Sequence, residues 1–217
     1  MKNYKHKTGV TLVEILIVIV IIAILAALVI AAAARINTRA KERLTESTIA
    51  LLNAALEEFH DYEYNFQGIY AGLKFPLDCN GFSENDLENE LGVALGSTVS
   101  INAVDHNNMY SGCEALYFLL NMVPECRETL NKINRSLMSN KGENGQDITV
   151  TVNGETSPLY RIIDPWGITL RYSYYRNTIR ETLPSAEPEQ GSPRAFPIIT
   201  STGPDKEFGT ADDITGR

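Results

Sequence analysis

Most signatures of an enzyme or a metalloprotein are missing from this chain of 217 residues. Its three histidines, His6, His60 and His106, lie far apart in the sequence and form no metal-ligand pattern. There is no zinc-binding spacing, no phosphate-binding glycine loop, and no nucleophile spaced with a histidine and an acid. We therefore expect a protein that is not an enzyme.

Basic residues are also fewer than acidic ones. Lys and Arg number 19 against 27 Asp and Glu, which gives a formal net charge of −8. A surface that binds nucleic acid carries a basic patch. We therefore expect no nucleic-acid partner.

Cysteine is scarce as well, because Cys79, Cys113 and Cys126 are the three in the chain. Three are too few for a disulfide scaffold. If the globular part lies outside the cytoplasm, one disulfide can form, and we expect it to join Cys113 to Cys126. The alternative is that all three are small, buried, apolar side chains.

Charge and helix breakers are absent from a long N-terminal stretch. No Gly or Pro interrupts residues 10–67, and 20 apolar residues separate Glu14 from Arg35. A helix of that length covers roughly 30 Å, the thickness of a hydrocarbon core. After Arg35 the apolar residues recur at steps of three and four, as in a one-sided amphipathic helix. We predict one helix over residues 10–66, transmembrane over 10–34, whose second half docks a globular head.

Glu14 is the one acidic residue within this N-terminal apolar segment. A carboxylate at the bilayer centre costs about 2.5–3.5 kcal/mol, and less near the interface. One interpretation is that Glu14 reaches water at the interface. The other is that a positive group neutralises it in the membrane. Cleavage after Gly9 would supply that group, because the new amine of Val10 would lie about one helical turn from Glu14.

The segment from Lys7 to Glu14, Lys-Thr-Gly-Val-Thr-Leu-Val-Glu, with the apolar run behind it, resembles the class III signal of type IV pilins and type II secretion pseudopilins. The resemblance implies that residues 1–9 are a leader, cut off by a prepilin peptidase. Gly9 would precede the cut, and Val10 would be methylated. Glu14 would then recruit the next subunit of a filament by pairing with its N-terminus.

The same resemblance implies a single-pass inner-membrane protein, with the leader in the cytoplasm and the head in the periplasm. Two residues depart from the family pattern: Val10 stands where Phe is usual, and Ala31 stands where a helix-breaking proline is common. The first weakens the match at the processing site. The second argues against local melting of the helix during assembly.

Two other targeting signals fit part of this segment. A secretory signal peptide would be cut near the alanines from Ala31 to Ala34, although its apolar core of about 7–15 residues is shorter than this run. An uncleaved membrane anchor is the other alternative. Basic residues flank the apolar run on both sides, so charge does not determine the orientation.

The remaining residues indicate an α+β fold. Residues 67–157 have mixed character, and the pattern predicts helices over 84–91, 115–120 and 125–138 and a strand over 98–104. Ser83 is the expected N-cap of the first of these helices. Capping-box spacing from Ser111 to Glu114 marks the second, and Pro124 marks the third.

Strands dominate the C-terminal part. Asn153-Gly154 predicts a hairpin turn between strands at 148–152 and 159–163. Further strands are expected up to Tyr172 and over 196–200, in a small antiparallel sheet within residues 158–217. Trp166 is expected to be buried in the core, packed against this sheet. Residues 177–194, with three prolines, are an expected exposed loop.

The C-terminal residues 201–215 are acidic and rich in turn formers. Asp205, Asp212 and Asp213 lie within nine residues, so their carboxylates can converge on one point. A hard cation such as Ca²⁺ takes about six to eight oxygen ligands. The residues alone are equally compatible with an acidic, solvated tail.

This loop also carries a resemblance. Ser201-x-Gly-x-Asp…Gly-Thr-x-Asp-Asp-Ile, like the Asp164-Pro-Trp-Gly…Tyr172 segment, resembles the major, G-type pseudopilins of type II secretion. The resemblance implies one Ca²⁺ that orders the loop. Its ligands would be the side chains of Asp205 and Asp212, with Asp213. Backbone carbonyls near Thr202 and Thr210 would complete the set.

Taken together, the sequence predicts a structural subunit of a type II secretion pseudopilus. Its partners would be copies of itself in a helical filament, the prepilin peptidase, the inner-membrane assembly platform and minor pseudopilins. A type IV pilus or competence pilin is the alternative within the family. A membrane-tethered extracytoplasmic binding domain is the alternative from another class. The resemblance covers residues 7–66 and 160–215, and no family suggests a role for the segment between.

Overall fold

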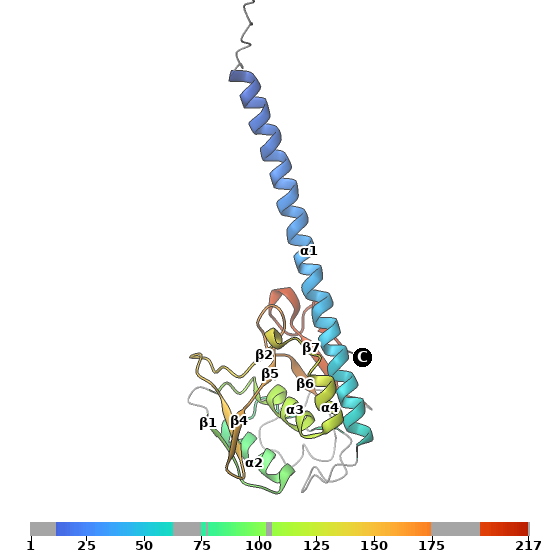
Figure 1. Cartoon of the computed structure of the whole chain (residues 1–217), viewed down its shortest axis with the longest axis vertical. Coiled ribbons are helices and arrows are strands. Elements are labelled where there is room, and N and C mark those ends of the chain that lie inside the picture. Colours follow the sequence, from blue (N-terminus) through green and yellow to red (C-terminus); the bar gives the residue numbers. More distant parts are fainter. Residues whose placement is uncertain (1–11, 63–74, 77, 103–105, 175–195, 217) are drawn as a thin grey trace, which may run out of the picture. The chain divides into compact units, whose positions relative to one another are not determined.

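The computed structural model describes residues 12–62, 75–76, 78–102, 106–174 and 196–216. The chain divides into two units, residues 1–41 and residues 42–217. The fold is α+β, as predicted, with a long N-terminal helix and a set of short helices and strands (Figure 1).

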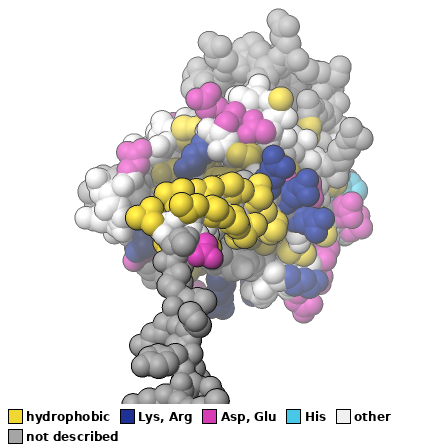
Figure 2. All heavy atoms as spheres, turned by 90° about the horizontal axis from the view of Figure 1, so that it is seen from above, with side chains coloured by type: hydrophobic (Ala, Val, Ile, Leu, Met, Phe, Trp, Pro, Cys, Tyr) yellow, Lys and Arg dark blue, Asp and Glu magenta, His cyan; other side chains and the backbone are white. Residues whose placement is uncertain are grey.

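Helix α1 runs from Leu12 to Asp61 without interruption. Its N-terminal half carries exposed Leu, Ile and Val side chains from Leu12 to Ile30, which make a continuous hydrophobic surface in Figure 2. The predicted helix extends to residue 66, but α1 ends at Asp61 and Tyr62 lies in a bend. No Gly or Pro marks this end in the sequence. Residues 63–66, like residues 10 and 11, lie outside the described part of the chain.

The C-terminal half of α1 is one-sided, as its periodicity predicts. Ile49, Leu52, Leu56 and Phe59 are buried in the hydrophobic core of the 42–217 unit. Glu46 and Glu57 on the same helix are exposed. This half of the helix is therefore a structural part of the head.

Three shorter α-helices follow among the described residues. Helix α2, Glu84–Leu95, begins at the predicted N-cap Ser83, whose side chain accepts from the backbone N–H of Asp86. Asp86 returns a bond to the Ser83 backbone and completes a capping box. The helix runs four residues past its predicted end, to Leu95, and is followed by Gly96 in a left-handed C-cap conformation.

The next two helices differ in part from their predictions. Helix α3, Ser111–Met122, has no side-chain cap, so the predicted capping box at Ser111 is wrong. The Ser111 hydroxyl donates to the Phe82 carbonyl instead. Helix α4, Pro124–Leu130, starts with proline in its first turn as predicted, but ends eight residues early. The remainder of the predicted range holds turn and irregular residues 131–134, a short 3-10 helix, η2 (Arg135–Leu137), and the first residue of a strand, Met138.

The strands of the described residues form three small antiparallel sheets. The first, in the order β1-β3-β4, joins Val99–Asn102, Thr149–Val152 and Glu155–Pro158. The second pairs β2, Met138–Ser139, with β5, Arg161–Ile162. The third, in the order β6-β7-β8, joins Arg171–Ser173, Ile198–Ser201 and Ile214–Thr215.

The predicted hairpin forms, but with a different second strand. Asn153 and Gly154 have φ values of 52° and 88°, which suit a two-residue hairpin turn. Because the turn is this tight, Val152 pairs with Glu155, and the returning strand is β4 rather than residues 159–163. Arg161 and Ile162 instead pair with β2.

Two expectations about buried side chains need correction. Trp166 is only half-buried, whereas Tyr172 is a core aromatic side chain, 1% exposed, that donates its hydroxyl to the Pro76 carbonyl. The three cysteines are buried free thiols, so the expected bond between Cys113 and Cys126 is not formed. The Cys126 thiol donates to the Ala55 carbonyl, whereas the Cys113 sulfur accepts from the Ile162 N–H.

Candidate functional site

The first candidate site is the start of α1. Gly9 and Val10, the expected processing residues, lie outside the described part of the chain. Glu14 lies in the first turn of α1 and is exposed. An acidic side chain is favoured there by the positive end of the helix dipole. Helix α1 is long and apolar enough to cross a membrane, by length and composition, and its apolar window is fully exposed.

The second candidate site is the loop between β7 and β8. Within it, each of the three predicted calcium-binding aspartates accepts a backbone hydrogen bond. The carboxylate of Asp212 accepts from the Asp205 N–H at 3.1 Å, and that of Asp205 accepts from the Glu207 N–H at 2.8 Å. Asp213 accepts from the Gly209 N–H at 2.8 Å. The loop therefore brings Asp205 and Asp212 together, while Asp213 closes a separate turn.

Gly203 brings the two ends of the loop into contact. It begins the 3-10 helix η4, Gly203–Asp205, and its φ of 67° is left-handed. A Cβ at this position would overlap the backbone carbonyl of Asp212. Only glycine combines this conformation with such a close approach.

The hydrogen bonds of the loop act on the pKa of Asp212. Thr210 donates its hydroxyl to Asp212 at 2.7 Å, and this bond, with that from the Asp205 N–H, holds the pKa of Asp212 below its ordinary value of 3.8. Asp213 Oδ1 is buried and accepts no hydrogen bond from the described residues. Within the described ranges no three His, Cys, Asp or Glu side chains are grouped as a metal site. Any cation here would need backbone carbonyls, or waters, beside the carboxylates.

Asp164 ties this loop to the rest of the head, and sequence reasoning missed it. It is 3% exposed, and its Oδ1 accepts from the N–H groups of Trp166 and Ile168. Its Oδ2 accepts from the hydroxyls of Ser201, at 2.8 Å, and Thr202. Both hydroxyl residues are fully buried. Thr202, expected to offer a carbonyl to calcium, thus anchors the start of the loop with its side chain.

A buried charged cluster lies elsewhere in the head. Glu114 of α3 contacts His106 at 2.8 Å and Arg161 at 3.4 Å, and all three side chains are almost inaccessible to solvent. The Arg161 guanidinium stacks over the Tyr110 ring at 3.5 Å and also donates to the Lys141 carbonyl. The sequence signal for this cluster was Glu114, a charged residue in the first turn of the apolar helix α3. Its spacing from Ser111 suggested a capping box instead.

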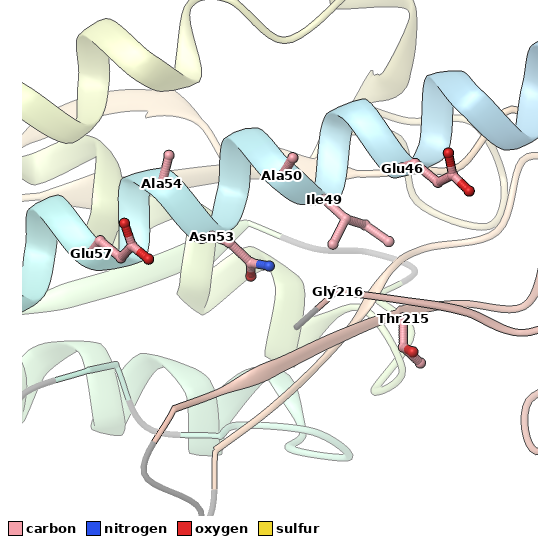
Figure 3. Close-up of a pocket in the computed structure, with 8 residues that line it drawn as sticks. All are labelled: Glu46, Ile49, Ala50, Asn53, Ala54, Glu57, Thr215 and Gly216. Atoms are coloured by element: carbon pink, nitrogen blue, oxygen red, sulfur yellow. The ribbon is translucent and has the colours of Figure 1, made fainter.

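A groove of about 290 Å³ lies between α1 and the end of β8. Figure 3 shows Glu46 and Glu57 at the two ends of this stretch of α1, with Ile49 and Asn53 pointing toward Gly216. Gly216 lies so close to the Ile49 and Asn53 side chains that a Cβ would overlap them. The groove is lined by Glu46, Ile49, Ala50, Asn53, Ala54, Glu57, Thr215 and Gly216.

Comparison with known families settles the nature of the N-terminal site. Residues 4–30 match the family model for the prokaryotic N-terminal methylation motif. The chain therefore carries a type IV pilin-like N-terminus. The match includes Gly9, Val10 and Glu14 and ends within the apolar half of α1. No curated protein and no solved structure matches the chain.

The methylation motif marks a substrate of prepilin peptidase, and with the exposed apolar half of α1 it indicates membrane anchoring. It accounts for 27 residues of the chain, those from 4 to 30. The head is outside the match, so its loop and its groove must be interpreted from their own chemistry.

Proposed function

We propose that the chain is a structural, non-catalytic subunit of a type II secretion pseudopilus. Prepilin peptidase would cut after Gly9 and methylate Val10, with the head in the periplasm. The observation that carries the proposal is the methylation motif on a helix whose apolar half is fully exposed. Such a surface is stable only in lipid or against other apolar helices. The assembly platform and minor pseudopilins would act on it as partners.

Assembly is proposed to depend on Glu14. After processing, the amine of Val10 in an incoming subunit would neutralise the Glu14 carboxylate of its neighbour within the membrane. An ion pair of this kind strengthens where water is excluded. The contact is heterologous, because different groups of the two copies meet, so it repeats into an open filament rather than a closed ring.

The experiment compares Glu14→Ala and Glu14→Gln with the native chain. N-terminal sequencing should show methyl-Val10 in all three, whereas sheared filaments should be lost in both variants. Glu128→Ala, which removes one exposed carboxylate from α4, is the matched control and should assemble normally. Normal filaments from Glu14→Ala would contradict the role of the ion pair. Native chain that retains Met1 would contradict the processing step itself.

A type IV or competence pilin would share this N-terminus. Deletion of the gene discriminates the two, because loss of secretion with no loss of surface fibres supports a pseudopilus. Loss of fibres with secretion intact would assign the chain to a pilus.

We further propose that the loop between β7 and β8 binds one Ca²⁺. Three features support it: the site offers only oxygen ligands, Asp205 and Asp212 are held together, and Asp213 Oδ1 is buried without a hydrogen-bond donor among the described residues. Ca²⁺ binds oxygen ligands of this kind and tolerates irregular coordination geometry.

Chelation with EGTA should lower the melting temperature of the native chain, and added Ca²⁺ should restore it. Asp212→Asn should melt at one temperature with or without the chelator. Asp61→Asn, at an exposed position outside the loop, is the control and should respond to chelation as the native chain does. An unchanged melt of the native chain would remove the calcium proposal and leave the filament proposal standing.

A further inference from the structure

We infer that the groove beside Gly216 is a docking surface for the basic segment of α1, residues 35–43, from a second copy of the chain. The inference rests on the proposed filament and names one of its contacts. It is carried by the groove itself and by the complementary charges of the two surfaces.

The groove is bounded by two acids that take part in no ion pair among the described residues. Glu46 and Glu57 are exposed, and none of the four ion pairs in the described structure includes either. They are 11 residues apart, which is about three helical turns, so they share one face of α1 roughly 16 Å apart. Exposed Ala50 and half-buried Ala54 lie between them in the sequence, and their small side chains line the same groove.

The basic segment offers the matching charges. Arg35, Arg39 and Arg43 recur at steps of four, so they form one stripe that spans roughly 12 Å of the helix. All three are exposed, and none forms an ion pair within the described residues. Arginine pairs with carboxylates through two parallel hydrogen bonds, and its long side chain covers the remaining few ångströms.

Contact of the whole stripe with the groove must join two copies. Within one helix only residues three or four apart face each other. Arg43 therefore faces Glu46 of its own helix, whereas Arg35 and Arg39 precede Glu57 by 22 and 18 positions and cannot reach it. The centres of the basic segment and of the groove differ by about 12 residues, or roughly 18 Å along a helix. Because parallel membrane helices keep the same direction, each copy would be shifted by about that length from the copy it contacts. A basic patch on an acidic groove is again heterologous and does not close into a ring.

Cysteine cross-linking tests the contact in membranes that contain the full chain. Ala40, beside the arginine stripe, and Ala54, in the groove, are replaced by cysteine in one chain. The native cysteines are buried and stay out of the reaction. Mild oxidation should give a disulfide ladder of dimers and higher species. A chain with Ala40→Cys and Glu155→Cys, the latter on the exposed strand β4, should give at least tenfold less.

Charge reversal tests the chemistry of the contact. Glu46→Arg with Glu57→Arg should reduce the ladder at least tenfold, and so should Arg35→Glu with Arg39→Glu. All four changes in one chain should restore it. Glu128→Arg, a charge reversal on α4 outside the groove, should have no effect.

The outcomes separate this inference from the proposed function. Filaments that form with no ladder between positions 40 and 54, or a ladder that ignores charge reversal, would overturn the docking surface and leave the filament intact. A cross-link from position 54 to a protein of different mass would also overturn it. A charge-dependent ladder in a chain that makes no filaments would support the docking surface and overturn the filament.

Discussion

Replacing Asp164 should loosen the head more than any exposed acid does. Its carboxylate accepts from two backbone N–H groups and two buried hydroxyls, so Asp164→Ala leaves four donors without their acceptor. A buried donor left unsatisfied costs about 1–3 kcal/mol. The hydroxyls can rotate, and Thr202 already has the Gly203 carbonyl within reach at 3.5 Å. We therefore expect a net loss of about 3–5 kcal/mol.

The expected change in melting temperature follows from this loss of free energy and from the size of the head. The unit from 42 to 217 contains 176 residues (217 − 42 + 1). For domains of this size each kcal/mol shifts the melting temperature by about 2–4 °C, so Asp164→Ala should melt roughly 6–20 °C lower. Asp164→Asn keeps one acceptor oxygen, and the hydroxyls can turn to accept from its amide. It should lose only about 1–2 kcal/mol.

The fluorescence of Trp166 allows unfolding to be followed close to Asp164. It is the single tryptophan and lies two residues from Asp164 in the same turn, so its fluorescence reports on this part of the head. Thermal and urea unfolding of the full chain in detergent should be followed by that signal. Asp61→Ala, which removes an exposed partner of His60, is the control and should cost under about 1 kcal/mol. If Asp164→Ala melts within 2 °C of that control, the buried carboxylate does not organise the loop.

Other regions of the head give three further predictions. Burial raises the pKa of the Cys113 and Cys126 thiols to about 12, so iodoacetamide at pH 8 should leave both unmodified until urea is added, as mass spectrometry would show. Glu114→Ala should cost about 3–5 kcal/mol in urea unfolding, because it leaves the Arg161 charge buried; a loss below 1 kcal/mol would contradict the cluster's role. The pKa of Asp212 is lower in the folded chain than its ordinary 3.8, so its contribution to stability is present above about pH 4 and lost as the pH falls through the folded value. Thr210→Val should therefore lose less melting temperature between pH 5 and pH 3 than the native chain, and an equal loss would show that the Thr210 hydroxyl does not set this pKa.

Local rules predicted much of the fold. The uninterrupted apolar run and the later one-sided periodicity predicted α1, because helix formation depends on residues three and four apart. The N-cap Ser83, the first-turn Pro124 and the Asn153-Gly154 turn each depend on neighbouring residues alone. All three predictions are confirmed. The methylation motif is also local, so the eight residues from Lys7 to Glu14 and the apolar run behind them were enough to indicate it.

Contacts between distant residues were not predictable in this way. Asp164 reaches Ser201 across 37 positions, and Glu114 reaches Arg161 across 47. A single sequence carries no periodic signal for such pairs. The predicted partner strand of β3 was wrong for a related reason. The hydrophobic residues favoured 159–163 as the returning strand, whereas a two-residue turn at Asn153-Gly154 requires that strand to begin at Glu155. At Ser111 the pattern fitted a cap, but burial of the hydroxyl against Phe82 prevailed.

The inward face of α1 has a practical consequence for anyone who wishes to study the head as a soluble fragment. Ile49, Leu52, Leu56 and Phe59 are each at most 5% exposed, and burying such a side chain contributes about 1.5–3 kcal/mol. Four of them amount to about 6–12 kcal/mol, which is comparable with the whole stability of a typical domain. A fragment that starts after residue 62 would lack the C-terminal half of α1, which forms one side of its hydrophobic core, and should aggregate. A fragment that starts near Glu42 keeps this half of the helix and omits the exposed apolar half.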